Sequence, residues 1–189
     1  MWLVVGLGNP GPKYELTRHN IGFLALDAVL DKHGSPSLKS SFSGMAARFD
    51  CAGVPCVALK PETFMNRSGS SVQQAMAFHK VPLHQVVVIH DDMDLPLGEL
   101  RIKQGGGSGG HNGLKDITRL LGESYVRIRL GIGRPQFKGS EADYVLSPFL
   151  DAELALLPSL FEQCSLALAT LIKDGLEVAL RSCQVKKAK

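Results

Sequence analysis

Two histidine–amide pairs and one acidic cluster are the residues of this chain that could do chemistry. His19-Asn20 comes just before a helical pattern, and His111-Asn112 stands at the end of a glycine run where another helix begins. Asp91-Asp92-Met93-Asp94 ends the continuous β-branched run 86–89, which is typical of a central buried strand. Ligands of open α/β sheets bind at the carboxyl ends of strands, and an imidazole there can act as a general base.

The acidic cluster allows two functional interpretations. Several carboxylates could together bind magnesium. Alternatively, one buried Asp could orient a histidine and stabilise it once it has taken a proton. Asp also commonly starts turns, and Pro96 and Gly98 indicate a turn nearby. Three acids within four residues exceed what a turn requires, so both functional interpretations stay open.

The segment 105–113 contains six glycines in nine residues. Each glycine loses more conformational freedom on folding than any other residue, so such a run indicates close backbone approach or a moving loop. The free N–H groups of the helix that starts after it suit an anionic or strongly polar ligand. We expect His111 and Asn112 to stand at that helix start.

Two further turns bring amides near predicted strand ends. Asn9 follows the first strand, and Asn66 lies in the segment 63–69 that leads into a helix. The structural alternatives are an Asx turn for Asn9 and an N-cap for Asn66. Phe64 and Met65 would add a soft apolar surface for a variable substrate.

Several common site types find little support in the sequence. Gly6-x-Gly8-x-x-Gly11 matches the dinucleotide fingerprint, but prolines intrude and the helix starts about ten residues late. The chain has no Gly-x-Ser-x-Gly motif, and its four cysteines form no CxxC pair or zinc spacing. We therefore expect no dinucleotide site and no covalent serine or cysteine mechanism.

Composition and charge indicate a globular protein with one basic region. The net charge is +3. Residues 101–138 hold eight basic side chains against two acids, which is +6 and leaves −3 elsewhere. This fits a partner with few phosphates in contact, although solvated strand and helix faces would account for it equally well. Reduced thiols, no signal peptide and no run long enough to span a bilayer are expected.

The 189 residues are expected to form one α/β domain without repeats or linkers. The region 35–44 reads as a loop, and the basic tail 184–189 should fray. Pro158 marks a kink or a new start in the last helical region, which Gly175 weakens. Strands are predicted at 2–6, 45–51, 56–60, 86–89, 98–103, 125–132 and 144–146, and helices at 21–34, 70–80, 114–121 and 151–181.

Taken together, the motifs resemble those of bacterial-type peptidyl-tRNA hydrolases. The resemblance runs from residue 2 to about 180, with the motifs in the family's order. They are Gly6-Leu7-Gly8-Asn9-Pro10-Gly11, Tyr14, Thr17-Arg18-His19-Asn20, Lys60–Gly69, His90–Pro96 and Gly105–Gly113. Departures are small: Asp92-Met93 stands where many members carry Glu-Leu, and Leu97 follows Pro96 in place of a second proline.

The resemblance implies a single domain with a twisted, mixed but mostly parallel β-sheet flanked by helices. It also implies a monomeric cytoplasmic enzyme, without metal or cofactor and not bound to membranes. Such enzymes hydrolyse the ester between peptide and tRNA and so recycle tRNA from aborted translation.

The resemblance also implies roles for individual residues. His19 matches the catalytic base and Asp91 the carboxylate that holds it. Lys103 and Arg129 match the basic pair that grips the 5′-phosphate of the acceptor stem. The implied substrate-binding residues are Asn9, Tyr14, Phe64, Met65, Asn66, His111 and Asn112.

Two other functions are weighed against this one. The first is a catalytically silent RNA-binding module of the same fold, which the joint presence of His19, Asp91 and Asn9 argues against. The second is a magnesium-dependent phosphohydrolase built on Asp91, Asp92 and Asp94.

Overall fold

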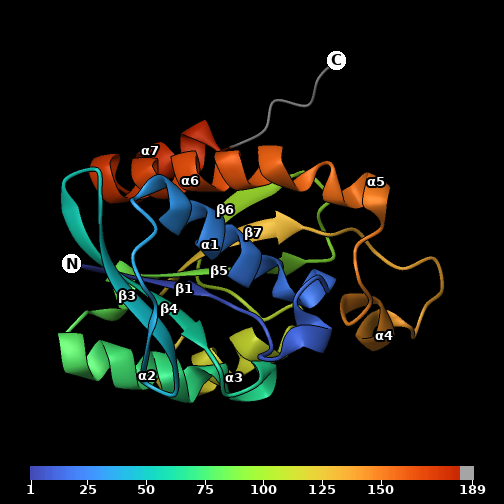
Figure 1. Cartoon of the computed structure of the whole chain (residues 1–189), viewed down its shortest axis with the longest axis horizontal. Coiled ribbons are helices and arrows are strands. Elements are labelled where there is room, and N and C mark those ends of the chain that lie inside the picture. The colour runs from blue at the N-terminus through green and yellow to red at the C-terminus, as the bar shows by residue number, and fades with distance from the viewer. Residues whose placement is uncertain (184–189) are drawn as a thin grey trace.

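Seven strands form one sheet in the order β2-β3-β4-β1-β5-β7-β6, in a computed structural model that describes residues 1–183 (Figure 1). The predicted fraying of 184–189 lies outside the described residues. The strands are β1 Trp2–Gly6, β2 Lys39–Ser41, β3 Gly44–Cys51, β4 Val54–Pro61, β5 Val86–Asp92, β6 Leu100–Gln104 and β7 Val126–Gly131. The α-helices are α1 Ile21–Lys32, α2 Ser68–His79, α3 Asn112–Leu121, α4 Glu141–Val145, α5 Asp151–Leu154, α6 Leu157–Asp174 and α7 Leu176–Ser182. Short 3-10 turns are η1 Pro12–Tyr14, η2 Arg18–Asn20, η3 Met65–Arg67 and η4 Leu83–Gln85.

The sheet is mixed, with parallel strands at its centre. β1 pairs in parallel with β4 and β5, and β5 pairs in parallel with β7. β2–β3, β3–β4 and β6–β7 are antiparallel, so β2, β4, β1, β5 and β7 run in one direction. The predicted mixed, mostly parallel sheet in one α/β domain is confirmed.

Helices cover both faces of the sheet, and Figure 1 shows the two layers. One core cluster joins α1, α6 and α7 to the sheet, and a second joins α2 and α3 to the opposite face. In β5, Val87 and Ile89 belong to the first cluster, whereas Val86 and Val88 belong to the second. Burial on both faces explains the continuous β-branched run that predicted this strand.

Two local predictions are wrong. Residues 144–146 were expected as a strand, but 141–145 form α4. Glu141 and Asp143 lie in its first turn, where acidic side chains favour a helix start. Residues 35–44 were expected as a loop, yet 39–41 form the edge strand β2. This polar strand exists through its pairing with β3, which local pattern does not reveal.

The C-terminal helical region is divided near Pro158 and at Gly175, as the sequence predicted. Pro158 lies in the first turn of α6, a new start that suits a residue without an N–H. Gly175, with φ of 87°, separates α6 from α7.

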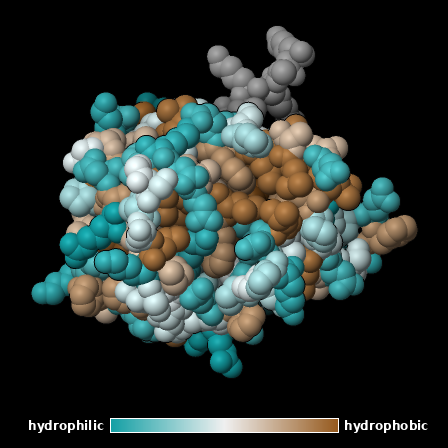
Figure 2. Space-filling model, viewed as in Figure 1, coloured by the Kyte–Doolittle hydropathy of each residue, from teal (hydrophilic) through white to brown (hydrophobic). Residues whose placement is uncertain are grey.

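The expectation about membrane-length segments needs a correction. By length and hydropathy, 151–174 meets the criterion for a membrane-spanning helix, and 44% of its apolar window is buried. Leu160, Cys164, Leu168 and Leu171 of this segment belong to the core cluster of α1. Figure 2 shows further apolar residues exposed between α1 and the α5–α6 segment. The buried residues recur at helical spacing, which is the pattern of a core helix of a globular domain.

Candidate active site

The candidate site lies where β1 and β5 end side by side. β1 lies between β4 and β5. α1, which follows β1, covers one face of the sheet, and α3, the next α-helix after β5, covers the other. The segments leaving β1 and β5 therefore diverge and open a crevice, as at the topological switch point of open α/β sheets.

Two glycines let α1 approach this edge closely enough to bring His19 to β5. A Cβ on Gly22 would lie 2.4 Å from the carbonyl oxygen of Ile89, and one on Gly6 would lie 2.4 Å from that of Gly22. No larger residue fits at either position without displacing backbone. Gly6 and Gly8 of the predicted fingerprint thus serve the packing of α1 against β1, because a Cβ on Gly8 would lie 2.6 Å from the ring of Phe23.

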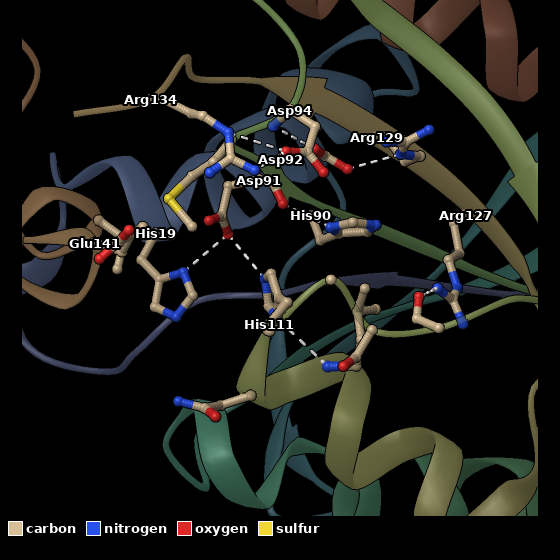
Figure 3. A pocket seen from close by; sticks show the side chains of 18 of the residues that line it. His19, His90, Asp91, Asp92, Asp94, His111, Arg127, Arg129, Arg134 and Glu141 are labelled. Carbon is tan, nitrogen blue, oxygen red and sulfur yellow. Dashed lines mark hydrogen bonds and ion pairs between the residues drawn. The ribbon is translucent and has the colours of Figure 1, made fainter. Parts of the chain in front are cut away.

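His19 and Asp91 form a buried hydrogen-bonded pair. His19 Nδ1 lies 2.9 Å from Asp91 Oδ1, and the side chains are 10% and 3% exposed. A carboxylate only accepts hydrogen bonds, so Nδ1 carries the proton and donates it. The lone pair of neutral His19 is then on Nε2, which has no hydrogen-bond partner among residues 1–183. Figure 3 shows this nitrogen turned away from Asp91.

His111 bonds the same carboxylate oxygen from the opposite side. Its Nε2 lies 2.9 Å from Asp91 Oδ1 (Figure 3). Its Nδ1 accepts hydrogen bonds from the backbone N–H groups of Gly113 and Leu114, at 3.1 and 3.4 Å. His111 is therefore the N-cap of α3, and the prediction that it stands at a helix start is confirmed.

The pKa values of Asp91 and of two neighbouring histidines, His19 and His90, are shifted in different directions. Burial would lower the pKa of His19, but the charge and hydrogen bond of Asp91 outweigh it and raise that pKa above 6.5. Burial would raise the pKa of Asp91, but His19 and His111 hold it far below its usual range. Burial, followed by the neighbouring His111, lowers the pKa of His90 to about 3. His90 is thus neutral near pH 7, while Asp91 is charged.

A cavity of about 630 Å³ opens beside this cluster. Of the predicted site residues, six line it: His19, Asp91, Lys103, His111, Asn112 and Arg129. Asn9, Tyr14, Phe64, Met65 and Asn66 do not. The glycine run forms one wall through Gly107–Gly110, and Glu141, Ala142 and Val145 from the α4 region line it as well.

Asn9 is held in place by three hydrogen bonds. Its backbone N–H and C=O pair with the side chain of Asn20, at 2.8 and 2.9 Å. Its side-chain oxygen accepts a hydrogen bond from the N–H of Met65 at 2.8 Å. The side-chain NH₂ of Asn9 is left as a donor in a fixed position.

The other predicted substrate-binding residues differ in how they are held. Met65 is buried, and Phe64 is 53% exposed with φ of 59°. Asn66 and Asn112 are exposed and make no side-chain hydrogen bond among residues 1–183. Tyr14, in η1, stacks against the ammonium group of Lys13.

The predicted basic pair stands on one face of the β6–β7 ladder. Arg129 Nε donates to Asp92 Oδ2 at 2.7 Å, which leaves its two terminal nitrogens available. Lys103 has no acidic partner within 4.0 Å in the described part of the chain. Between them, Arg127 is 2% exposed and donates to the carbonyls of Gly106 and Gly107, at 2.6 and 2.7 Å. Arg127 therefore pins the glycine run to the sheet.

The acidic cluster does not gather into a metal site. Asp91 bonds the two histidines, Asp92 bonds Arg129, and Asp94 pairs with Arg134. His19, Asp91 and His111 offer ligand atoms within 4.8 Å of one another. A metal on His111 Nε2 would require a proton on Nδ1, which already accepts two backbone N–H groups. These residues therefore do not fit a metal ion.

The structure gives several residues of the site roles that the sequence did not predict. Asn20 fixes Asn9, Arg127 fixes the glycine run, and Asp116 accepts a hydrogen bond from the N–H of Gly69 at the start of α2. Arg18 is buried, donates to Ser147, Pro148 and Glu153, and lies over the ring of Tyr144. Only the position of Arg18 and Asn20 on either side of His19 could have indicated their roles.

Comparison with known proteins gives consistent matches over the whole chain. The family model described as Peptidyl-tRNA hydrolase matches residues 3–189. A peptidyl-tRNA hydrolase of Geobacter metallireducens is 49% identical over 175 residues, covering 92% of this chain and 90% of that protein. One of Bdellovibrio bacteriovorus is 44% identical over 181 residues, covering 95% and 97%. A crystal structure of peptidyl-tRNA hydrolase from Acinetobacter baumannii superimposes with a TM-score of 0.93 at 36% identity, covering 100% of this chain and 97% of that one.

Proposed function

The chain belongs to the peptidyl-tRNA hydrolase family, and from that premise we propose that His19 and Asp91 carry the hydrolysis of peptidyl-tRNA. The substrate is peptidyl-tRNA, and the bond broken is the ester between the peptide and the 3′-terminal ribose. The observation that carries the proposal is the buried His19–Asp91 hydrogen bond, with His19 Nε2 free. A catalytically silent RNA-binding module is not favoured.

Ester hydrolysis requires an activated water, and neutral His19 can provide the base. Nε2 takes a proton from water as the oxygen attacks the ester carbonyl, and the same proton can then pass to the leaving ribose oxygen. Asp91 holds Nδ1–H, which fixes the tautomer and stabilises the imidazolium that forms. The raised pKa of His19 suits a base that operates near neutral pH.

The oxyanion that develops on the ester carbonyl requires hydrogen-bond donors. The side-chain NH₂ of Asn9 is preorganised, because its oxygen is bound to the N–H of Met65. Preorganised donors matter most, since one such donor is worth about 2.7–4 kcal/mol in a well-studied protease. We assign substrate contacts to Asn9 first, with the exposed Asn66 and Asn112 approaching when substrate binds. Tyr14, Phe64, Met65 and His111 complete the proposed surroundings of the peptide and the ribose.

We assign the 5′-phosphate of the acceptor stem to Lys103 and Arg129. Lys103 is unpaired among residues 1–183, and Arg129 keeps two terminal nitrogens for a phosphate while Asp92 holds its Nε. A phosphate contact identifies the tRNA end without reading bases, which suits an enzyme that accepts many tRNAs. Such an enzyme must also accept any peptide, and amide side chains bind peptide backbone regardless of sequence.

The proposed reaction uses no metal, and the enzyme is proposed to act as a monomer in the cytoplasm. The separate hydrogen-bond partners of Asp91, Asp92 and Asp94 support the first point. Full activity after dialysis against a chelator is expected. Loss of activity that magnesium or zinc restores would contradict it.

The test of the proposal is release of an N-acetylated amino acid from tRNA by wild type and by a His19→Ala variant. We expect kcat to fall by several orders of magnitude while tRNA binding changes little. A variant with retained turnover would remove His19 as the base. Arg101→Lys, on an exposed position of β6, serves as the matched control and should keep wild-type kcat.

A further inference from the structure

His111 makes two sets of hydrogen bonds that fix its protonation state. Its Nδ1 accepts two backbone N–H groups at the start of α3, so the single proton of the neutral ring is on Nε2. That proton is donated to Asp91 Oδ1. The side chain is 7% exposed, so the substrate contact proposed for His111 is confined to a small part of its ring.

His19 and His111 therefore compete for one oxygen atom. Both donors lie 2.9 Å from Asp91 Oδ1, and their ring centroids are 4.9 Å apart. A donor that shares an anionic oxygen draws on its charge and weakens the field that the other donor feels. His111 also connects that oxygen to the positive end of α3, because the ring caps the helix.

We propose that His111 is a positioning residue that limits the basicity of His19 by sharing the charge of Asp91, and that it ties the glycine run to this pair. The inference rests on the proposed role of His19 as the base. Its consequence is a base that is protonated less readily than it would be if Asp91 Oδ1 accepted a hydrogen bond from His19 alone.

Among the described residues, the other charged groups near His19 hydrogen-bond neither to its ring nor to the carboxylate of Asp91. From β5, Asp91 is the bonded carboxylate, and His90 is neutral because burial keeps its pKa at about 3. From α4, Glu141 lines the same cavity, and from the adjoining segments Arg134 and Asp94 pair with each other. In α1 the first charged residue, Asp27, is bound by Lys60, and Arg18 beside His19 is bound by Glu153. This leaves His111 as the group that shares Asp91 with His19 in Figure 3.

Two amide substitutions separate the two roles of His111. The amide of Asn falls near the place of Nδ1, so His111→Asn keeps a good N-cap but cannot reach Asp91. The amide of Gln falls near the place of Nε2, so His111→Gln restores a donor to Asp91 while losing the cap. Lys115→Ala, at an exposed position of the same helix, is the control.

The experiment is an NMR titration of the His19 ring in each variant, together with the pH profile of kcat/KM. In His111→Asn, we expect the His19 titration and the acidic limb of the profile to move up by about one pH unit. Activity below the limb then falls about tenfold relative to the plateau of the same variant, and the readout is the pH at which the limb lies, which loss of a substrate contact alone would not move. His111→Gln and Lys115→Ala should titrate like wild type. If the Asn variant does not fold, His111→Ala takes its place with the same expected order.

An unchanged or lowered His19 titration in His111→Asn would overturn the inference, and so would equal shifts in the Asn and Gln variants. Asp91→Asn, which should lower the titration, shows that the measurement detects such shifts. Failure of the proposed function appears elsewhere, as retained turnover in His19→Ala. The NMR readout does not depend on which residue is the base, so the two failures are distinguishable.

Discussion

Replacing Arg127 with Lys should release the glycine run while leaving the fold intact. Arg127 donates from two different nitrogens to the carbonyls of Gly106 and Gly107, and its guanidinium lies 4.8 Å from the centroid of the Tyr125 ring. A lysine at this position keeps the charge, but its compact ammonium cannot reproduce the fork that spans both carbonyls. One of the two hydrogen bonds is therefore lost.

The expected loss follows from these contacts. A hydrogen bond to a charged group is worth about 1.5–3 kcal/mol. Local opening of the run should become easier by that amount, which corresponds to about 10- to 150-fold faster exchange of its protected amides. Two amides report on it, because Gly105 N–H is bonded to the carbonyl of Tyr125 and His111 N–H to that of Ser108. Since the run carries His111 and Asn112, KM should rise more than kcat falls.

The assay is amide hydrogen exchange by NMR, with Arg101→Lys as the control. Arg101 is exposed on the neighbouring strand, and its ion pair with Glu99 is long, at 3.8 Å. Exchange at Gly105 and His111 that is unchanged in Arg127→Lys, or equally fast in the control, would refute the idea that Arg127 holds the run.

Three further outcomes are expected. Because the pKa of His19 is raised, the neutral base is lost as pH falls through a value above 6.5, and the acidic limb of kcat/KM should lie there. Asp91→Asn should shift this limb to lower pH and also lower kcat. A limb that does not move would contradict the pairing of His19 with Asp91. Lys103→Ala should weaken tRNA binding and reduce the slope of log affinity against log salt by about one. An unchanged slope would contradict the proposed contact between Lys103 and a phosphate. Asp116→Ala should destabilise the protein by about 0.5–2 kcal/mol in thermal unfolding, because it removes the oxygen that accepts the N–H of Gly69 at the start of α2. An unchanged melting temperature would show that this cap contributes nothing.

Local sequence pattern predicted the elements whose character is set by neighbouring residues. The β-branched run 86–89 predicted β5, and the strands predicted at 45–51 and 56–60 correspond to β3 and β4. The helix start at His111 was also predicted, because glycines end before a periodic apolar pattern begins. In each case, the signal lies within about ten residues of the element.

Features that depend on distant partners were not predicted. β2 is a strand because β3 pairs with it, and Arg127 is buried because carbonyls 20 and 21 residues away accept its protons. Asn20 was noted in the sequence only as the amide beside His19, yet its side chain fixes Asn9, 11 residues earlier. The roles of His19 and Asp91, 72 residues apart, came from the family resemblance, and their hydrogen-bond contact came from the structure.

The alternation of β5 explains why its two acids, Asp91 and Asp92, do not form one metal site. Val87 and Ile89 face the cluster of α1, so Asp91 follows them toward the helix that carries His19. His90 and Asp92 belong to the other face, where Arg129 stands in the neighbouring strand and bonds Asp92. The pleat therefore separates these two consecutive carboxylates: Asp91 accepts hydrogen bonds from two histidines, and Asp92 pairs with Arg129. The sequence left open whether the cluster binds magnesium or orients a histidine. The alternation of side chains along β5 supports the histidine interpretation, because it directs Asp91 and Asp92 to opposite faces of the sheet.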